Sequence, residues 1–332
     1  MNTCSPPGRT SCVVVVTSKI PQIIRLAPQH NERQTPNKRG FQMIEARNVT
    51  KFFSVVNEDR TADGITAVLS VSLTVDDGKI MSFLGPSGCG KSTFLEILGG
   101  LQAPTEGGVY IDGVQVLEPL PSTRKEMDDY RRKYKFLSPL ANSMFKNRPK
   151  HDIAMIFQDY AVFPWMTALQ NVMFALKLRG IPRREREGKA MVYLKKTGLA
   201  DSQRKYPSQL SGGMRQRLAL ARALAVEPRI IMMDEPFAAV DTLTRERLQD
   251  DLLHLLNETG ITIILVTHDI NEALYLSDEV VVFSANPGSI RNRFPIEIPR
   301  PRRRSDPELL ALGQRIEALF KYDINHESEY SI

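Results

Sequence analysis

Short apolar runs that alternate with helical patterns dominate the middle of this chain. Runs typical of buried strands occupy residues 79–84, 229–233 and 261–266. The first run is followed by apolar side chains at helical spacing between residues 94 and 101, which predicts a strand, a turn and a helix in succession. Strands that alternate with helices are typical of a mainly parallel sheet flanked by helices. The pattern therefore predicts an α/β fold.

Two other patterns predict smaller parts beside this core. Alternation of apolar and polar positions over residues 67–75 predicts a half-buried strand in a small antiparallel β subdomain. Helical patterns at residues 169–178 and 184–197 predict a helical subdomain at about residues 158–228.

The carboxyl end carries its own pattern. Pro307 precedes apolar residues at helical spacing, which predicts an amphipathic tail helix. The arginine-rich run at residues 300–304 is interpreted as a solvated run of charge.

The turn after the first strand has the composition of a phosphate-binding loop. Glycines allow backbone N–H groups to converge on phosphate oxygens, and the start of the following helix adds a partial positive charge. Lys91 would reach the β- and γ-phosphates of a nucleotide, and the Ser92 hydroxyl would bind Mg²⁺. The alternative is a glycine-rich structural turn. The predicted nucleotide-binding residues here are Gly85, Pro86, Ser87, Gly88, Cys89, Gly90, Lys91, Ser92 and Thr93.

Polar side chains also follow the other two predicted core strands. Asp234 and Glu235 are adjacent, and neighbouring side chains of an extended strand point to opposite faces. Asp234 is therefore expected to hold the metal and Glu235 to act as the general base. His268 follows the third strand and is predicted to contact the γ-phosphate, because ligands of open α/β sheets bind at the carboxyl ends of strands. The alternatives are an acidic turn and a packing histidine.

Six motifs occur in the order and approximate spacing of an ABC transporter ATPase subunit, which the chain resembles over roughly residues 43–299. They are the phosphate loop, the glutamine at 158, and the segments 210–214, 233–236, 238–241 and 267–269. The resemblance implies a P-loop NTPase of ABC type, with ATP and Mg²⁺ as cofactors.

Several further roles are implied by this resemblance alone. Gln158 would complete the Mg²⁺ shell and sense the γ-phosphate. Phe53 would stack on adenine, with Phe52 as a rival. The segment Ser211, Gly212 and Gly213 would meet the γ-phosphate held by another protomer, so the chain would work as a homodimer or with a paired ABC subunit. Asp241 would help to set the geometry of the opposite site.

The segment 210–214 also has a simpler interpretation. Ser211 can cap the helix predicted at residues 214–225, and this is the role expected of an ordinary N-capped helix start.

Large apolar residues just after Gln158 indicate a partner. Phe163, Trp165 and Met166 could form a groove for a helix of a separate integral membrane permease, or could pack in the core. In ABC importers the equivalent stretch receives the permease. The segments at 163–165 and 286–310 are similar to nitrate/sulfonate/taurine importer ATPases.

That similarity implies an energy-coupling importer subunit on the cytoplasmic face of the inner membrane, bound peripherally. An extracytoplasmic solute-binding protein is expected in the same system. The alternatives are an exporter ATPase, an ABC ATPase that acts on nucleic acid or ribosomes, and a regulatory protein.

Composition narrows these alternatives. No apolar run approaches the roughly 20 residues that a membrane-spanning helix needs. The net charge of +6 comes from two segments, because residues 1–42 carry six basic and one acidic side chain and residues 114–152 carry nine and five. The rest of the chain is net negative, so no nucleic-acid partner is expected.

The two basic segments also set the expected domain limits. Residues 1–42 lack periodicity and are predicted to be a disordered basic extension; translation starting at Met43 is a hypothesis. Residues 43–299 would form the nucleotide-binding domain, with an unusual basic insertion at 114–152 that contacts lipid, contacts a regulator or is simply a surface loop. Residues 300–332 would form the tail.

Overall fold

A six-stranded sheet forms the centre of the computed structural model, which describes residues 42–56, 62–117, 119, 153–238, 240–284 and 287–327. Its strand order is β10-β9-β3-β8-β7-β6, and all neighbours are parallel except β10 and β9. The strands are β3 (Ile80–Leu84), β6 (Ile153–Ile156), β7 (Ile230–Asp234), β8 (Thr262–Thr267), β9 (Glu279–Phe283) and β10 (Ile290–Pro295).

The parallel strands are buried on both faces. Every residue of β3 and β8 is buried, as expected where helices cover both sides of a parallel sheet. Because β3, β6, β7 and β8 run in the same direction, the loops that follow them lie at one edge of the sheet. This edge receives the predicted phosphate loop, Gln158, Glu235 and His268.

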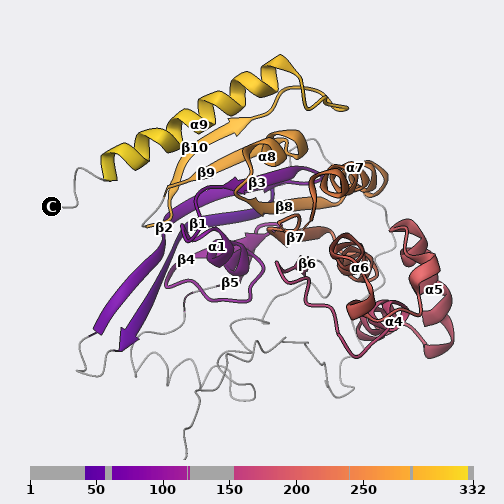
Figure 1. Ribbon diagram of the computed structural model, residues 1–332. Coiled ribbons are helices and arrows are strands. Elements are labelled where there is room, and N and C mark those ends of the chain that lie inside the picture. Colours follow the sequence, from indigo (N-terminus) through magenta and orange to yellow (C-terminus); the bar gives the residue numbers. More distant parts are fainter. Residues whose placement is uncertain are drawn as a thin grey trace, which may run out of the picture. The chain divides into compact units, whose positions relative to one another are not determined.

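A second, antiparallel sheet packs beside the first, with α1 (Lys91–Leu98) between them (Figure 1). Its order is β2-β1-β4-β5, and the predicted half-buried strand is part of β2. The bounds are β1 (Gln42–Val56), β2 (Ala62–Asp76), β4 (Glu106–Ile111) and β5 (Val114–Leu117). Three rings, Phe83, Phe94 and Phe283, meet in the shared core with centroids 5.4 to 5.8 Å apart.

The helical subdomain has a small core of its own. It contains α4 (Ala168–Leu178), α5 (Arg183–Lys196) and α6 (Gly212–Leu224), with short 3₁₀ helices at Ala200–Ser202 and Pro207–Gln209. Alanine and leucine side chains from all three α-helices fill this core. Both helices predicted between residues 169 and 197 are confirmed, and α6 confirms the third.

Three helices complete the described structure: α7 (Thr242–Thr259), α8 (Ile270–Leu276) and α9 (Pro307–Glu327). The tail helix begins at Pro307 as predicted, and it packs against α8 and β9 through Leu309 and Ile316. Across the described ranges, no helix combines the length and the apolar character needed to cross a membrane.

The interpretation of residues 300–304 as solvated charge is wrong. Arg302 is only 6% exposed, and its neighbours Arg300 and Arg304 are partly buried by the contacts described below. The expectations for the extension before residue 42 and for most of the basic insertion at residues 114–152 lie outside the described residues.

Candidate functional site

The phosphate loop connects β3 to α1 through residues that need glycine. Gly88 and Gly90 have φ angles of 80° and 89°, in the left-handed region where a Cβ is strained. A Cβ on Gly90 would also lie 2.1 Å from the Ala67 carbonyl oxygen of β2. The loop therefore closes against the antiparallel sheet and places the start of α1, with its free N–H groups, at the sheet edge.

Lys91 is held within this loop. Its side chain is buried, and Nζ donates to the carbonyl oxygens of Gly85 at 2.8 Å and Pro86 at 2.7 Å. The Cys89 Sγ atom lies 3.5 Å from the same nitrogen and is buried, so it fills the loop interior. The Lys91 ammonium group is therefore held inside the loop, where it would also contact a bound anion.

Ser92 and Asp234 form the oxygen-rich part of the site. The Ser92 hydroxyl donates to Asp234 Oδ1 at 2.9 Å, which joins the start of α1 to the end of β7. Burial raises the pKa of Asp234, while the bond from Ser92 opposes this shift. A hydroxyl and a carboxylate are oxygen ligands of the kind that Mg²⁺ prefers. This donor set fits the metal predicted from the sequence.

Glu235 faces different partners from those of Asp234. Its Oε1 lies 3.4 Å from His268 Nδ1, and its Oε2 accepts from Gln158 Nε2 at 3.4 Å. The backbone of Glu235 has a φ of 45°, a conformation that non-glycine residues adopt rarely and that is concentrated at functional sites. The structure therefore brings three of the predicted residues together from the ends of β6, β7 and β8.

The loop after Gln158 is anchored by a residue that the sequence analysis missed. Arg222 of α6 donates to the carbonyl oxygens of Ala161 at 2.5 Å and Tyr160 at 3.1 Å, and its guanidinium lies 5.3 Å from the Phe163 ring centroid. Burial lowers the pKa of Arg222 to about 10. The positive φ angles of Tyr160 and Ala161 turn their carbonyls toward this side chain, a geometry with no sequence signal.

The segment 211–213 and Asp241 lie together, apart from the phosphate loop. Ser211 caps α6 by accepting from Met214 N at 3.3 Å, as its simpler interpretation predicts, and Asp241 caps α7 by accepting from Thr244 N at 3.1 Å. A Cβ on Gly213 would lie 2.7 Å from Thr244 Cγ2, so the two helix starts touch. Within the described part of the chain, no hydrogen bond or ion pair joins residues 211–213 to residues 85–92.

The two candidate adenine-stacking rings lie on β1. Phe53 is 38% exposed and has Lys51 Nζ 5.1 Å from its ring centroid. The Phe52 ring instead covers Gly64 of β2, where a Cβ would lie 1.7 Å from Cζ of that ring. Phe52 is 44% exposed, so exposure does not separate the two rings, and the nearby cation is the feature that distinguishes Phe53.

A groove of about 420 Å³ opens on the helical subdomain. Trp165 is 69% exposed, which excludes core packing for this side chain, and its ring lies 5.6 Å from that of Phe163. The buried Asn171 holds the loop by donating to the carbonyls of Phe163, Met166 and Thr167. The groove is lined by Trp165, Met166, Gln170, Met173, Phe174, Lys177 and Arg186.

These observations define a P-loop nucleotide hydrolase: a glycine-rich loop around a buried lysine, a hydroxyl bonded to a carboxylate, and a second carboxylate flanked by histidine and glutamine at one sheet edge. Residues 68–238 match the family model for ABC transporters. An uncharacterized ABC transporter ATP-binding protein of Methanocaldococcus jannaschii is 39% identical, with 85% of this chain and 92% of that protein aligned. The chain therefore belongs to the ABC transporter ATPase family, and it is an ATPase.

Two relatives from Synechocystis carry more specific names. The nitrate import ATP-binding protein NrtD is 34% identical over 80% of this chain and 92% of its own length. The bicarbonate transport ATP-binding protein CmpD is 37% identical over 78% of this chain and 83% of its own length. Among solved structures, a dimeric ATP-binding cassette in a post-hydrolysis state with ADP and phosphate matches with a TM-score of 0.60 and 34% identity, covering 77% of this chain and all of that one.

Proposed function

We propose that this chain is the ATP-hydrolysing subunit of an importer for small oxyanions such as nitrate or bicarbonate, which works as a dimer on a separate membrane permease. The observation that carries the proposal is the meeting of Glu235, His268 and Gln158 beside the phosphate loop. The names of the two Synechocystis relatives support the cargo class, and nitrate also belongs to the nitrate/sulfonate/taurine group that the sequence resembles. Sulfonates and taurine remain part of this proposal.

Glu235 is the proposed general base. Its carboxylate would take the proton of a water molecule that attacks the γ-phosphorus. One carboxylate oxygen lies near His268 Nδ1, and the other accepts from Gln158 Nε2. His268 fixes the carboxylate and would contact the γ-phosphate. Mg²⁺, held by Ser92, Asp234 and Gln158, would neutralise phosphate charge.

The second half of the ATP site is proposed to come from a partner subunit. At the start of α6, Ser211 is exposed, Gly212 is half-buried and Gly213 is buried, and free N–H groups of this helix start would approach an anion. Asp241 lies beside them at the start of α7. The dimeric assembly of the matching cassette supports this arrangement.

The groove around Trp165 is the proposed permease contact. It is apolar at Trp165, Met166, Met173 and Phe174 and bears cations at Lys177 and Arg186, which suits an amphipathic helix with an acidic end. An exposed tryptophan beside a groove is a typical binding anchor. Membrane attachment on the cytoplasmic face, with a solute-binding protein outside, completes the proposal.

The test is Glu235→Gln, which keeps the size of the side chain and removes its basicity. We expect kcat for ATP hydrolysis to fall by about 100-fold or more, with ATP binding retained and dimers accumulating in ATP. Glu187→Gln, at an exposed position on α5, is the matched control and should keep the wild-type rate. Wild-type turnover by Glu235→Gln would refute the assigned base.

A further inference from the structure

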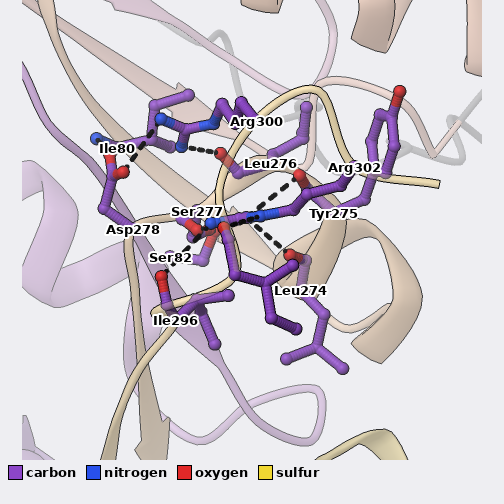
Figure 2. A network of polar contacts seen from close by, with 11 residues as sticks. Ile80, Ser82, Leu274, Tyr275, Leu276, Ser277, Asp278, Ile296, Arg300 and Arg302 are labelled. Atoms are coloured by element: carbon purple, nitrogen blue, oxygen red, sulfur yellow. Dashed lines mark hydrogen bonds and ion pairs between the residues drawn. The ribbon is translucent and has the colours of Figure 1, made fainter. Parts of the chain in front are cut away.

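The arginines of the tail point into the fold at alternate positions. Arg300 donates to Asp278 Oδ1 at 2.8 Å and to the Leu276 carbonyl at 2.5 Å, while the other Asp278 oxygen accepts from Ile80 N at 2.8 Å (Figure 2). This contact ties the tail to the start of β3. Arg302 and Arg304 also point into the fold, through the contacts described next.

Arg302 holds the end of α8. This helix has seven residues, too few to be stable alone, and its last carbonyls have no partner within the helix. Figure 2 shows the Arg302 guanidinium among these carbonyl oxygens. It donates to Leu274 at 2.9 Å, Tyr275 at 3.2 Å and Ser277 at 2.6 Å, and to Ile296 at 3.3 Å and Ile298 at 2.9 Å.

Arg304 continues this contact onto α7. Its Nη1 donates to Gln249 Oε1 at 2.7 Å, its Nη2 lies 3.3 Å from Asp250 Oδ1, and its guanidinium stacks 3.7 Å from the Tyr275 ring centroid. Nε also lies 3.7 Å from a Glu246 carboxylate oxygen. Because a guanidinium only donates hydrogen bonds, Arg304 forces the Gln249 oxygen toward itself and the amide nitrogen away.

The Gln249 amide nitrogen contacts the buried carboxyl group of Glu272, on the helix α8 that follows His268. Gln249 Nε2 donates to Glu272 Oε2 at 3.3 Å, and both side chains are almost fully buried. The Thr267 side chain lowers the pKa of Glu272, and Thr267 Oγ1 accepts from Asp269 N at 3.0 Å. The residues on both sides of His268 are therefore fixed by one polar chain that starts at Arg304.

A second contact joins the loop at His268 to the loop before Asp241. Arg245, one turn before Gln249 on α7, lies 3.5 Å from Asp269 Oδ2 and donates to the Val240 carbonyl at 3.0 Å. Asp269 in turn caps α8 by accepting from Glu272 N at 3.1 Å. One face of α7 thus supports both the loop at His268 and the loop before Asp241.

We propose that Arg304, acting through Gln249 and Glu272, is a positioning residue that holds His268 in place for ATP hydrolysis. The inference rests on the proposed role of His268. The tail thereby contributes to hydrolysis. Arg302 fixes the carboxyl end of α8, and Arg304 fixes the Gln249 amide that supports the amino end of α8. Loss of Arg304 frees the Gln249 amide to rotate and leaves Glu272 with a weaker partner.

The test compares Arg304→Ala with Arg303→Ala in the full chain. Both variants lose one positive charge from adjacent positions, but Arg303 is exposed, and its described hydrogen bonds are made by its backbone N–H and C=O. We expect Arg304→Ala to lower kcat about five-fold or more with KM for ATP within about two-fold, and Arg303→Ala to match the wild type. Hydrogen exchange of residues 267–276 should rise in Arg304→Ala alone.

A double variant separates a connected chain from independent packing. If Arg304 acts through Gln249, Arg304→Ala with Gln249→Met should have the kcat of the slower single variant rather than the product of the two losses. Gln249→Met keeps the volume of the side chain. If Arg304→Ala does not fold, Gln249→Met alone tests the same chain of contacts.

Several outcomes overturn the inference. They are equal kcat in Arg304→Ala and Arg303→Ala, a slower Arg304→Ala with unchanged exchange at 267–276, or fully multiplicative losses in the double variant. The proposed function fails separately, through wild-type turnover by His268→Ala, which leaves the exchange result intact.

Discussion

The two segments proposed to bind phosphate differ in how many of their contacts come from the rest of the chain. In the loop at residues 85–92, Lys91 is buried against two carbonyls and Ser92 is bonded to Asp234. At residues 211–213, the Ser211 side chain is exposed and bonds only the start of its own helix. The functional side chains of the first segment are held by contacts with the rest of the chain, whereas the second segment leaves the start of α6 open to another molecule.

The difference is consistent with two tasks. The phosphate loop closes on β2, so its geometry depends on the tertiary fold of one chain. The segment 211–213 belongs to the helical subdomain and touches the core at Thr244 of α7. We infer that the first segment is built to hold a nucleotide and the second to meet one held elsewhere.

The largest expected effect is at Gly90. In Gly90→Ala the new Cβ would lie 2.1 Å from the Ala67 backbone oxygen at a φ of 89°, so the loop cannot keep its shape. We expect ATP binding to be lost and the protein to be destabilised by about 3 kcal/mol or more, measured by ATP titration and thermal unfolding.

Gly113→Ala is the matched control for backbone strain. Gly113 has a φ of 76° in the turn between β4 and β5, with nothing within 4 Å of a Cβ. It should cost about 1 kcal/mol and leave ATP binding intact. Equal behaviour of the two variants would contradict the close contact between the phosphate loop and β2.

A smaller effect is expected at Gly213. The Cβ of Gly213→Ala would lie 2.7 Å from Thr244 Cγ2, a side-chain methyl group that can move. We expect a several-fold loss of kcat from displacement of the helix start, with ATP binding to the phosphate loop retained. Thr244→Ser removes the clashing methyl group and should restore the rate in the double variant. Failure of this rescue would show that the two helix starts do not limit each other.

The smallest expected effect is a dependence of fold stability on pH, which comes from the buried Glu272. Burial raises the pKa of Glu272 to about 7, and Asp269 adds to the shift, whereas Thr267, Arg245 and Gln249 oppose it. A carboxyl group with a raised pKa stabilises the fold below its ordinary pKa of 4.5, and this contribution is lost as pH rises through 7.

Thermal unfolding at several pH values checks this sign. The Tm of the wild type minus that of Glu272→Gln should decrease from pH 5 to pH 8, because only the wild type carries the titrating group. A constant difference across this range would contradict the raised pKa.

The sequence predicted the elements and much of the site because those signals are local. The strand, glycine turn and helix around Lys91 are encoded within one short segment, and β3, α1 and β7 lie where expected. The positions of α4, α5 and α9 were also confirmed. The motifs placed Gln158, Glu235 and His268 at the ends of parallel strands, where the structure joins them.

The sequence did not reveal contacts between distant segments. Arg302 was interpreted as solvated because charged runs are usually exposed, yet it holds carbonyls of α8 that lie more than 20 residues earlier. The inward direction of Arg300, Arg302 and Arg304 depends on contacts with distant residues and carries no local sequence signal. The Arg222 contact depends on two left-handed residues that are not glycine, and it had no such signal.

The central claim is that a complete ATP site needs two chains. The most direct test measures the ATPase rate per chain across a dilution series, with sedimentation recording the fraction of dimer at each concentration. The account predicts that the rate per chain falls with dilution in parallel with the dimer fraction. An unchanged rate per chain at concentrations where the protein is monomeric would contradict it.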